Sequence, residues 1–388
     1  MNSRSMPSSA RAARLKPSQI REVAELGMTL PDVTPLWFGE SAWPTGEIAV
    51  QAAISALSGG DHFYQPNSGK ISFRNAICQY LESWYEQPFE RSRITVTASG
   101  MQGLALTAQA LIDPGDQVVC IEPAWPNMAE CFQIAGADIR TLALDIVDDQ
   151  WTLDLDHLIS LITPSTKALV INSPSNPTGW VMPAADQASL LEHCRKTGTW
   201  IVADDVYARL YRHGPVAPGF LALATPDDRL ISVSSFSKAW SMTGWRLGWI
   251  TAPAELEATF AMLTEFNIAG PSGIIQQAGE RMIIDGESEV ELLTQRLQAG
   301  YAQVEACLEA IPTVRFVRPE GAFYCFFAVD GMSDSVSFAK TLLHDAKVGL
   351  APGRAFGPAG EGYLRLCYAQ PSSTLEPALE RLRRALTR

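Results

Sequence analysis

The chain has 388 residues, of which 47% are hydrophobic and 19% are charged, a balance typical of a globular enzyme. Its formal net charge of -12 argues against a general binder of nucleic acids or anionic membranes. No stretch reaches the roughly 18 to 20 apolar residues that a membrane-spanning helix needs. The seven cysteines lack the spacing of paired metal ligands, so we expect no metal site, no disulfide framework and a cytoplasmic location.

The length exceeds that of one typical core, and we expect two domains. Residues 1–17 contain four basic residues and no acid, which predicts a flexible tail, with a weak targeting signal as the alternative. A helical pattern over residues 17–27 is expected to pack with the C-terminal part of the chain. The predicted division is therefore a large cofactor-binding domain, residues 45–282, and a discontinuous small domain, residues 18–44 and 283–388.

Short apolar runs that are typical of strands alternate with helical patterns through the middle of the chain. These runs are QVVCIEP, IRTLAL, KALVINSP, TWIVADD, RLISVSS and LGWITAP. Several are apolar on both faces, as are strands in a buried parallel sheet. Residues 182–198 show helical spacing and end at Gly198, because glycine favours the end of a helix. The alternation predicts a doubly wound α/β layer with a mostly parallel sheet.

From about Ile283 the pattern changes to that of a smaller α+β unit. One long amphipathic helix is expected over residues 287–311. The strand-like run AFYCFFAV at residues 322–329 and a helix over residues 335–346 follow it. The strand-like run YLRLCYA at residues 363–369 then precedes a final basic helix.

Polar motifs follow several expected strands, where open α/β sheets bind their ligands. In TASGMQG, Gly100 and Met101 open a helix whose free backbone N–H groups suit a phosphate, although an ordinary strand–helix turn would look the same. In INSPSNPTG, Asn172 and Asn176 are either ligand-facing amides or turn residues.

Two further motifs add charged groups. Asp204 ends an apolar strand, where a carboxylate is costly without a cationic partner, although a helix N-cap would also explain it. Tyr207 follows three residues later and is expected near the same ligand. The motif SFSKAWSMTGWR contains three side chains that suit an anion, namely Ser235, Ser237 and Arg246.

Lys238 in the same motif would lie among cationic neighbours in a partly dry site. Such surroundings lower the pKa of an amine and make it nucleophilic toward an aldehyde. A phosphorylated aldehyde with a basic ring nitrogen would use every one of these groups, and pyridoxal phosphate is that molecule.

These motifs also resemble those of a known family. NSPSNPTG, ADDVY and SFSKAWSMTGWRLGW occur in the order and spacing of class I/II aminotransferases, which are pyridoxal-phosphate enzymes of fold type I. The match runs from about Leu36 to Ala369 and is nearest to the bacterial aspartate-aminotransferase-like subgroup. The resemblance implies a large domain with a mostly parallel doubly wound sheet, a smaller α+β domain, and a homodimer with shared active sites.

The resemblance also implies a role for each candidate. Lys238 forms the imine with the cofactor and moves the substrate proton, and Asp204 pairs with the ring nitrogen. Tyr207 and Asn176 bind the 3-oxygen of the ring. The other implied cofactor contacts are the stacking side chain Trp125 and the phosphate ligands Gly100, Met101, Ser235, Ser237, Arg246 and, from the neighbouring subunit, Tyr64.

The substrate contacts implied by the resemblance are Arg365, Gly39 and Asn176, with Arg365 binding the α-carboxylate. From the residues alone, an arginine in the apolar run GYLRLCYA is costly without an anion, and a buried structural ion pair is the alternative. In the same way, Trp125 is either a ligand contact or core, and Tyr64 is either a site residue or part of a turn.

The expected reaction is transfer of the amino group of an L-amino acid to a 2-oxo acid, with 2-oxoglutarate as the expected acceptor. Elimination or cyclisation of an amino acid is the alternative, because the cofactor anchors would be the same. A non-catalytic sensor is a third hypothesis, which the presence of both Lys238 and Arg365 disfavours. The aromatic side chains that either line a substrate pocket or belong to the core are Trp37, Phe38, Trp43 and Phe63.

Overall fold

The computed structural model describes residue 9 and residues 12–387. Most of the expected tail, residues 1–17, lies outside this part of the chain, so its flexibility stays a prediction. The described end of that segment contains one turn of 3-10 helix, η1 (Ala12–Arg14), and leads into helix α1 (Gln19–Met28).

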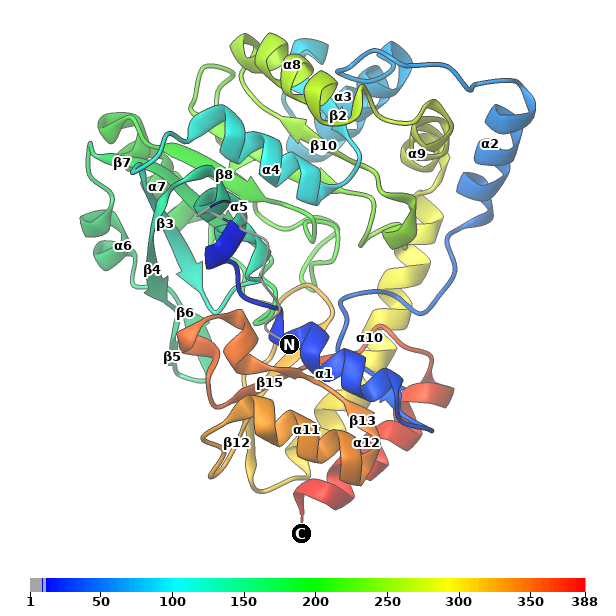
Figure 1. Ribbon diagram of the computed structural model, residues 1–388, viewed down its shortest axis with the longest axis vertical. Coiled ribbons are helices and arrows are strands. Elements are labelled where there is room, and N and C mark those ends of the chain that lie inside the picture. Colours follow the sequence, from blue (N-terminus) through cyan, green and yellow to red (C-terminus); the bar gives the residue numbers. More distant parts are fainter. Residues whose placement is uncertain (1–8, 10–11, 388) are drawn as a thin grey trace, which may run out of the picture.

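A seven-stranded sheet forms the centre of the larger part of the molecule (Figure 1). From one edge to the other its strands are β2 (Ile94–Thr97), β10 (Gly248–Thr251), β9 (Leu230–Ser235), β8 (Trp200–Asp204), β7 (Thr166–Asn172), β3 (Gln117–Glu122) and β4 (Asp138–Ala143). Strand β10 is antiparallel to both of its neighbours, and the other neighbouring pairs are parallel. The predicted mostly parallel α/β sheet is thus confirmed.

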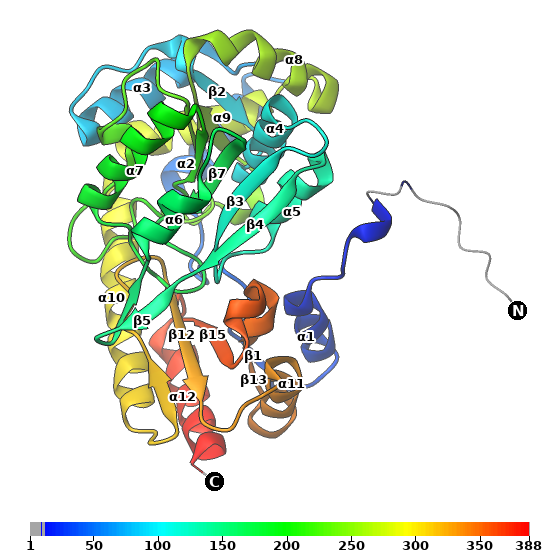
Figure 2. The same ribbon diagram turned by 90° about the vertical axis from the view of Figure 1, so that its left-hand side faces the viewer.

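Helices cover both faces of this sheet because its strands are apolar on both faces. In β3, Val118 and Cys120 belong to one hydrophobic cluster, whereas Val119 and Ile121 belong to another. Figure 2 shows the sheet edge-on between the two helical layers. The helices of these layers are α4 (Gly100–Leu111), α5 (Asn127–Ala135) and α8 (Glu257–Ile268) on one face, and α3 (Ile71–Tyr85), α6 (Leu155–Leu161) and α7 (Ala184–Thr197) on the other.

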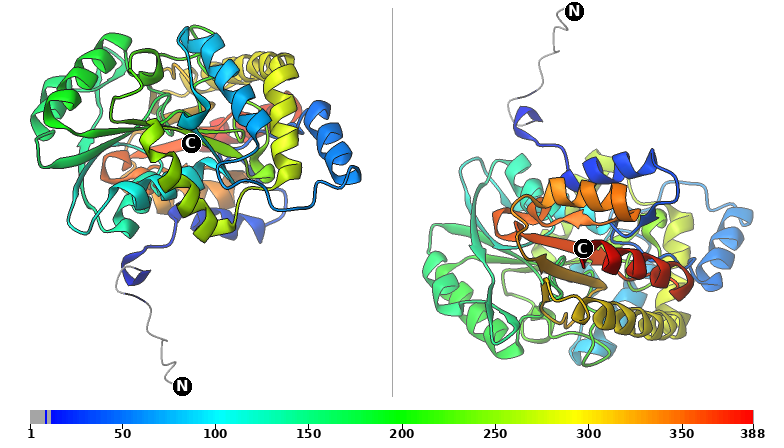
Figure 3. Two further views of the ribbon diagram at one scale, coloured as in Figure 1. Left: turned by 90° about the horizontal axis from the view of Figure 1, so that it is seen from above. Right: turned by 90° about the horizontal axis from the view of Figure 1, so that it is seen from below.

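A second, antiparallel sheet forms the smaller part and confirms the predicted α+β unit. Its strands are, in order, β11 (Val314–Phe316), β12 (Tyr324–Val329), β15 (Tyr363–Cys367) and β14 (Ala351–Pro352). Helix α1 packs against helix α11 (Ser335–Ala346) and β14, as expected. Seen from below, α12 (Ser372–Leu386) lies between α11 and the long helix α10 (Glu287–Glu309), and it packs against both (Figure 3).

The remaining elements lie outside these two sheets. Strand β1 (Thr34–Pro35) pairs in parallel with β13 (Val348–Gly349), which attaches the chain after α1 to the small sheet region. The others are α2 (Glu47–Ser58), α9 (Gly273–Asp285), the hairpin β5 (Asp145–Val147) and β6 (Gln150–Thr152), and the 3-10 turns η2 (Arg91–Arg93), η3 (Phe220–Ala222), η4 (Thr243–Trp245), η5 (Ala254–Leu256), η6 (Gly353–Phe356) and η7 (Pro358–Gly360).

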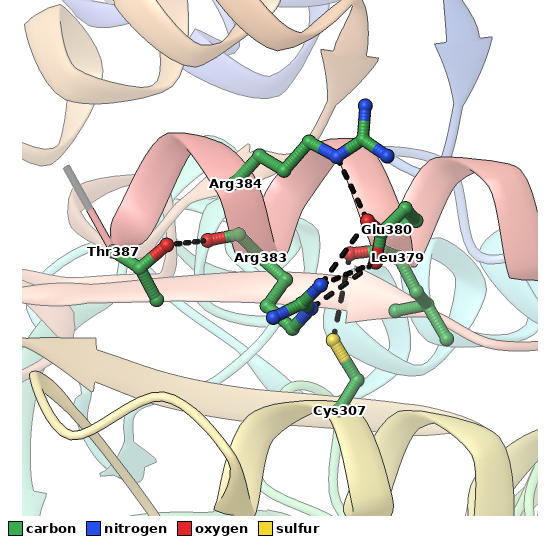
Figure 4. Close-up of polar contacts among 6 residues, drawn as sticks. All are labelled: Cys307, Leu379, Glu380, Arg383, Arg384 and Thr387. Atoms are coloured by element: carbon green, nitrogen blue, oxygen red, sulfur yellow. Dashed lines mark hydrogen bonds and ion pairs between the residues drawn. The ribbon is translucent and has the colours of Figure 1, made fainter.

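The final helix α12 is basic, as the sequence predicts, and its arginines Arg383 and Arg384 lie on a solvated face. Arg383 and Arg384 both bind the carboxylate of Glu380, one helical turn earlier (Figure 4). Below Arg383 in the same view, the thiol of Cys307 in α10 donates to the carbonyl oxygen of Leu379 at 3.5 Å. These charges therefore belong to the surface of the small domain.

Two general features concern only the described residues. None of their helices combines the length and the apolar character needed to cross a membrane. They also contain no cluster of three or more His, Cys, Asp or Glu side chains that could hold a metal ion. All seven cysteines lie in this part of the chain and carry free thiols.

Candidate active site

A cavity of ≈ 480 Å³ lies where the carboxyl ends of β7, β8 and β9 meet the small sheet. Every predicted site residue except Tyr64 lines it. The residues brought together are Gly39, Gly100, Met101, Trp125, Asn176, Asp204, Tyr207, Ser235, Ser237, Lys238, Arg246 and Arg365. They come from both sheets, because the strand ends of the large sheet face β12 and β15 of the small one.

Lys238 follows β9 and directs its amine into this cavity. Its Nζ donates to the carbonyl oxygen of Gly39 at 2.5 Å and lies 5.7 Å from the ring centroid of Tyr207. No carboxylate of a described residue forms an ion pair with it. Burial lowers the pKa of Lys238 to about 8, and the nearby guanidinium of Arg365 acts in the same direction. An amine in this state is partly uncharged near neutral pH and is available as a nucleophile or a base.

Asp204 is the last residue of β8 and is 3% exposed. The backbone N–H of Val206 donates to its Oδ1 at 3.3 Å, and the side chain of Asn172 donates to its backbone oxygen at 2.8 Å. Burial raises the pKa of Asp204 to about 7 despite the N–H of Val206, and the adjacent Asp205 raises it further. Residues 206–209 form a turn and no helix directly follows Asp204, so Asp204 is not the N-cap of a helix. A buried acid of this kind favours a cationic ligand group.

The first turn of α4 forms a cradle for an anion. Gly100 and Met101 are its first residues, and their backbone N–H groups have no intrahelical partner. The hydroxyls of Ser235 and Ser237 lie 3.0 Å apart beside it, and Arg246 also lines this wall. A Cβ at Gly100 would lie only 3.2 Å from the Cβ of Ser235, so glycine keeps the cradle open.

Arg365 in β15 is 2% exposed and lies across the cavity from the large sheet. Its Nη1 donates to Oδ1 of Asn176 at 2.8 Å, and its Nη2 donates to the carbonyl oxygen of Trp37. The guanidinium lies 4.4 Å from the ring centroid of Tyr324, and its Nε is buried without a partner. It forms no ion pair with any residue that the structure describes, so the structural ion-pair alternative is wrong. The unpaired charge suits a ligand carboxylate.

The aromatic candidates differ in their positions. Trp125 is half-buried and lines the cavity, while it also packs on the hydrophobic cluster beneath α4. Phe38 lines the cavity too, but Trp37 is core and is 3% exposed. Phe63 and Tyr64 are 82% and 89% exposed on the loop between α2 and α3, outside the cavity of their own chain.

Several residues of the cavity were missed by sequence reasoning. Tyr324 of β12 lines it, and its hydroxyl oxygen lies 2.6 Å from that of Tyr207. The one available signal was a hydroxyl inside the apolar run AFYCFFAV, analogous to the arginine in GYLRLCYA. Ser18, Ile20 and Arg21 at the start of α1 also line the cavity, and the helical pattern of this segment contained no signal for it.

The residues of the cavity fit pyridoxal phosphate. The open helix terminus and Arg246 match a phosphate, the buried unpaired carboxyl of Asp204 matches a basic ring nitrogen, and the amine of Lys238 matches an aldehyde. Each of these groups is otherwise without an ionic partner among the described residues, which gives the cofactor a physical reason to bind here.

Comparisons with known proteins agree with this chemistry. Residues 33–382 match the model of the family Aminotransferase class I and II. An aspartate aminotransferase from Pyrococcus horikoshii is 30% identical over 380 residues, covering 97% of this chain and 96% of that protein. Aromatic-amino-acid aminotransferase 2 from Thermococcus litoralis is 29% identical and covers 98% of each chain. The solved structure of Thermus thermophilus aspartate aminotransferase with maleate has a TM-score of 0.91 and 30% identity, covering 98% of this chain and 100% of that chain. The chain therefore belongs to the class I and II aminotransferase family and is a pyridoxal-phosphate-dependent aminotransferase with the α/β fold of its relatives.

Proposed function

We propose that this aminotransferase moves the amino group of an L-amino acid to a 2-oxo acid, with 2-oxoglutarate as the acceptor. The observation that carries the proposal is the buried guanidinium of Arg365, which has no ionic partner among the described residues and shares a cavity with the amine of Lys238. An α-carboxylate is common to amino acids and 2-oxo acids, so one guanidinium serves both halves of the reaction. Aspartate and aromatic amino acids, which the names of relatives contain, are the first donors to test.

When bound, pyridoxal phosphate supplies an aldehyde that joins the amino group and a cationic ring that withdraws electrons from the α-carbon of the substrate. In our proposal Asp204 holds the proton of the ring nitrogen, and Tyr207 and Asn176 bind the 3-oxygen. Trp125 covers one face of the ring. The phosphate would be held by Gly100, Met101, Ser235, Ser237 and Arg246.

The proposed general base is Nζ of Lys238. Because the pKa of Lys238 is lowered to about 8, both of its protonation states are populated near neutral pH. The amine can therefore accept the proton of the substrate α-carbon and return it. The carbonyl of Gly39 restrains this amine at 2.5 Å, and Arg365 orients the substrate by its carboxylate.

A single-turnover experiment tests the reaction type. The cofactor-loaded protein is mixed with a panel of amino acids without any 2-oxo acid, and the visible absorbance of the cofactor is followed. Transamination predicts one equivalent of 2-oxo acid per site and then a halt until 2-oxoglutarate is added. Continuous release of ammonia without an acceptor would identify the elimination alternative and contradict the proposal.

We also propose a homodimer, in which Tyr64 reaches the phosphate of the neighbouring subunit. Phe63, Tyr64 and Phe266 are all more than four-fifths exposed, which is costly for large apolar side chains in a monomer. Asn67 donates to Glu265 at 3.1 Å, so the loop of Tyr64 lies against the end of α8 that carries Phe266. These contacts support one apolar surface, with a second copy of the chain as its cover.

The same surface adjoins the cavity, because Gln102 in the first turn of α4 donates to Asn267 in α8 at 2.7 Å. Sedimentation velocity tests the dimer: Phe266→Glu should shift the protein toward monomer, whereas Tyr64→Phe should leave the dimer intact and weaken cofactor binding. An active wild-type monomer would remove Tyr64 from the site.

We further propose the division into residues 45–282 and residues 18–44 with 283–388 as two domains. It is supported by the position of the two sheets, each of which falls within one part, and by the packing of α1 on α11. A cytoplasmic location is proposed on the seven free thiols, six of them buried, which suit a reducing compartment. Limited proteolysis that cuts first near residue 44 and near Gly286, between α9 and α10, would support the domain division.

A further inference from the structure

Tyr324 is a buried hydroxyl at the junction of the two sheets. It begins β12, is 0% exposed as a residue and lines the cavity. Its hydroxyl oxygen lies 2.6 Å from that of Tyr207, and the two rings meet edge to face with centroids 5.8 Å apart. Among the described residues, the hydroxyl of Tyr324 has no other hydrogen-bond partner.

The direction of this hydrogen bond follows from the number of hydrogens. Burial raises the pKa of both tyrosines above the ordinary value, so both hydroxyls are neutral at physiological pH. Each hydroxyl has one hydrogen, so one oxygen donates to the other and the second hydrogen is left for another acceptor. A buried hydroxyl hydrogen without an acceptor is unfavourable. The hydroxyl that a ligand can reach should therefore keep its hydrogen for the ligand, and the other hydroxyl should donate its hydrogen to the first.

Either hydroxyl could donate to the other, and the packing around Tyr324 favours Tyr324 as the donor. A Cβ on Gly39 would lie 2.0 Å from the hydroxyl oxygen of Tyr324, so this oxygen is packed directly against the backbone of Gly39. The guanidinium of Arg365 covers its ring at 4.4 Å. Tyr324 is thus confined by Gly39 on one side and Arg365 on the other, and among the described residues Tyr207 is the hydrogen-bond partner of its hydroxyl.

We propose that Tyr324 is a positioning residue that donates its hydroxyl hydrogen to Tyr207 and thereby aims the single hydrogen of Tyr207 into the cavity. This inference rests on the role proposed above for Tyr207, which is to bind the 3-oxygen of the cofactor. A hydroxyl that accepts one hydrogen bond is also a stronger donor in the next one. Tyr324 therefore favours the anionic form of that oxygen without touching it.

The test is a pH titration of the visible absorbance of the bound cofactor in Tyr324→Phe, a substitution that removes one oxygen and keeps the ring. We expect the midpoint to rise by about half a unit to one unit, which corresponds to the loss of one hydrogen bond. The KM for the amino acid should stay within about twofold, because the ring beneath Arg365 is retained. Tyr363→Phe, in β15 of the same sheet and outside the cavity lining, is the matched control and should leave the midpoint unchanged.

A double-mutant cycle with Tyr207→Phe shows whether Tyr324 acts through Tyr207. We expect Tyr207→Phe to raise the midpoint, and Tyr324→Phe to add nothing in that background. An equal shift in both backgrounds, or no shift in Tyr324→Phe alone, would overturn the inference while leaving the role of Tyr207 intact. If Tyr207→Phe itself leaves the midpoint unchanged, the role of Tyr207 and the inference both fail. Equal melting temperatures of the variants and the parent protein establish that folding is unaffected.

Discussion

Two regions of this molecule differ in whether a buried arginine has an ion-pair partner within the chain. Arg74 and Arg209, which are 6% and 7% exposed, each form an ion pair, with Glu257 and Glu287 respectively. Arg365 is 2% exposed and binds only an amide oxygen and a backbone carbonyl among the described residues. Since an unpaired buried charge is costly, the difference fits our proposal that Arg365 binds the carboxylate of a ligand.

Buried acids show the same contrast. Asp228 receives two hydrogen bonds of 2.7 Å from Arg195, and this hydrogen bonding lowers the pKa of Asp228. Asp204 has no cationic partner in the described part of the chain, and burial raises its pKa to about 7. Arg74, Arg209 and Asp228 are thus paired within the chain, whereas Arg365 and Asp204 in the cavity have no ionic partner among the described residues; the same holds for Arg93, which is buried outside the cavity.

The largest effect that this comparison predicts is that of Lys238→Ala. It should abolish the visible absorbance of the bound cofactor and lower kcat by several orders of magnitude, because the amine is the proposed nucleophile and base. Absorbance spectra and steady-state assays measure both. Lys196→Ala, which removes a 70%-exposed surface lysine paired with Glu192, is the control and should match the parent protein. Retained absorbance in Lys238→Ala would contradict the assignment.

The comparison of the arginines is tested by Arg365→Met and Arg209→Met. The first should lower kcat/KM by about 100-fold or more, mainly through KM, because two charged hydrogen bonds to a carboxylate are lost. It should not lower the free energy of unfolding of the cofactor-free protein. Arg209→Met should instead lower this free energy by about 1–3 kcal/mol, a value limited by the 45% exposure of Glu287, and leave KM unchanged. Reversed outcomes in urea unfolding and kinetics would break the comparison.

The raised pKa of Asp204 predicts a specific pH dependence of the cofactor-free protein. The folded protein binds this proton more tightly than the unfolded chain does, so stability falls as pH rises from about 4 to about 7. Asp204→Asn should reduce that fall by a few kcal/mol at most. Burial also raises the pKa of Asp205 to about 6, so the stability of Asp204→Asn should still fall with rising pH, but by less. Urea unfolding at pH 5 and pH 7.5 measures the difference, and an unchanged fall in Asp204→Asn would show that the carboxyl is not perturbed.

The smallest effect is expected at the surface pairs of α12. Glu380→Ala removes the partner of Arg383 and Arg384, but the three side chains are 40% to 67% exposed. The loss should be below about 1 kcal/mol in the free energy of unfolding, with no change in kcat or KM. Thermal unfolding measures this loss, and a loss well above about 1 kcal/mol would mean that surface ion pairs also stabilise this fold substantially.

Much of the fold could be predicted from the sequence because the strands are apolar on both faces. Strands β3, β7 and β8 contain continuous apolar runs, and the helix over residues 182–198 ends at Gly198 with the expected left-handed backbone, φ 74°. Strand β2 was not predicted, because ITVT has only four residues and alternates with threonine. Its place at the sheet edge depends on antiparallel pairing with β10, which is distant in sequence.

Most of the cavity was predictable for a related reason. Asp204, Asn176 and Lys238 lie in short polar motifs that directly follow apolar strands, so their positions at the strand ends are local properties. Local patterns also identified Arg365 as an unusual charge in an apolar run. They could not show whether its partner is a carboxylate of the chain or of a ligand.

The sequence by itself determined which side chains end the strands, because periodicity and turn chemistry act over a few residues. Only the tertiary structure decided which of them meet. The hydroxyls of Tyr207 and Tyr324 are 117 residues apart in sequence, and the contact between Arg365 and Asn176 spans 189 residues. Contacts of this kind depend on how two sheets pack against each other, and packing is a property of shape that no local pattern encodes.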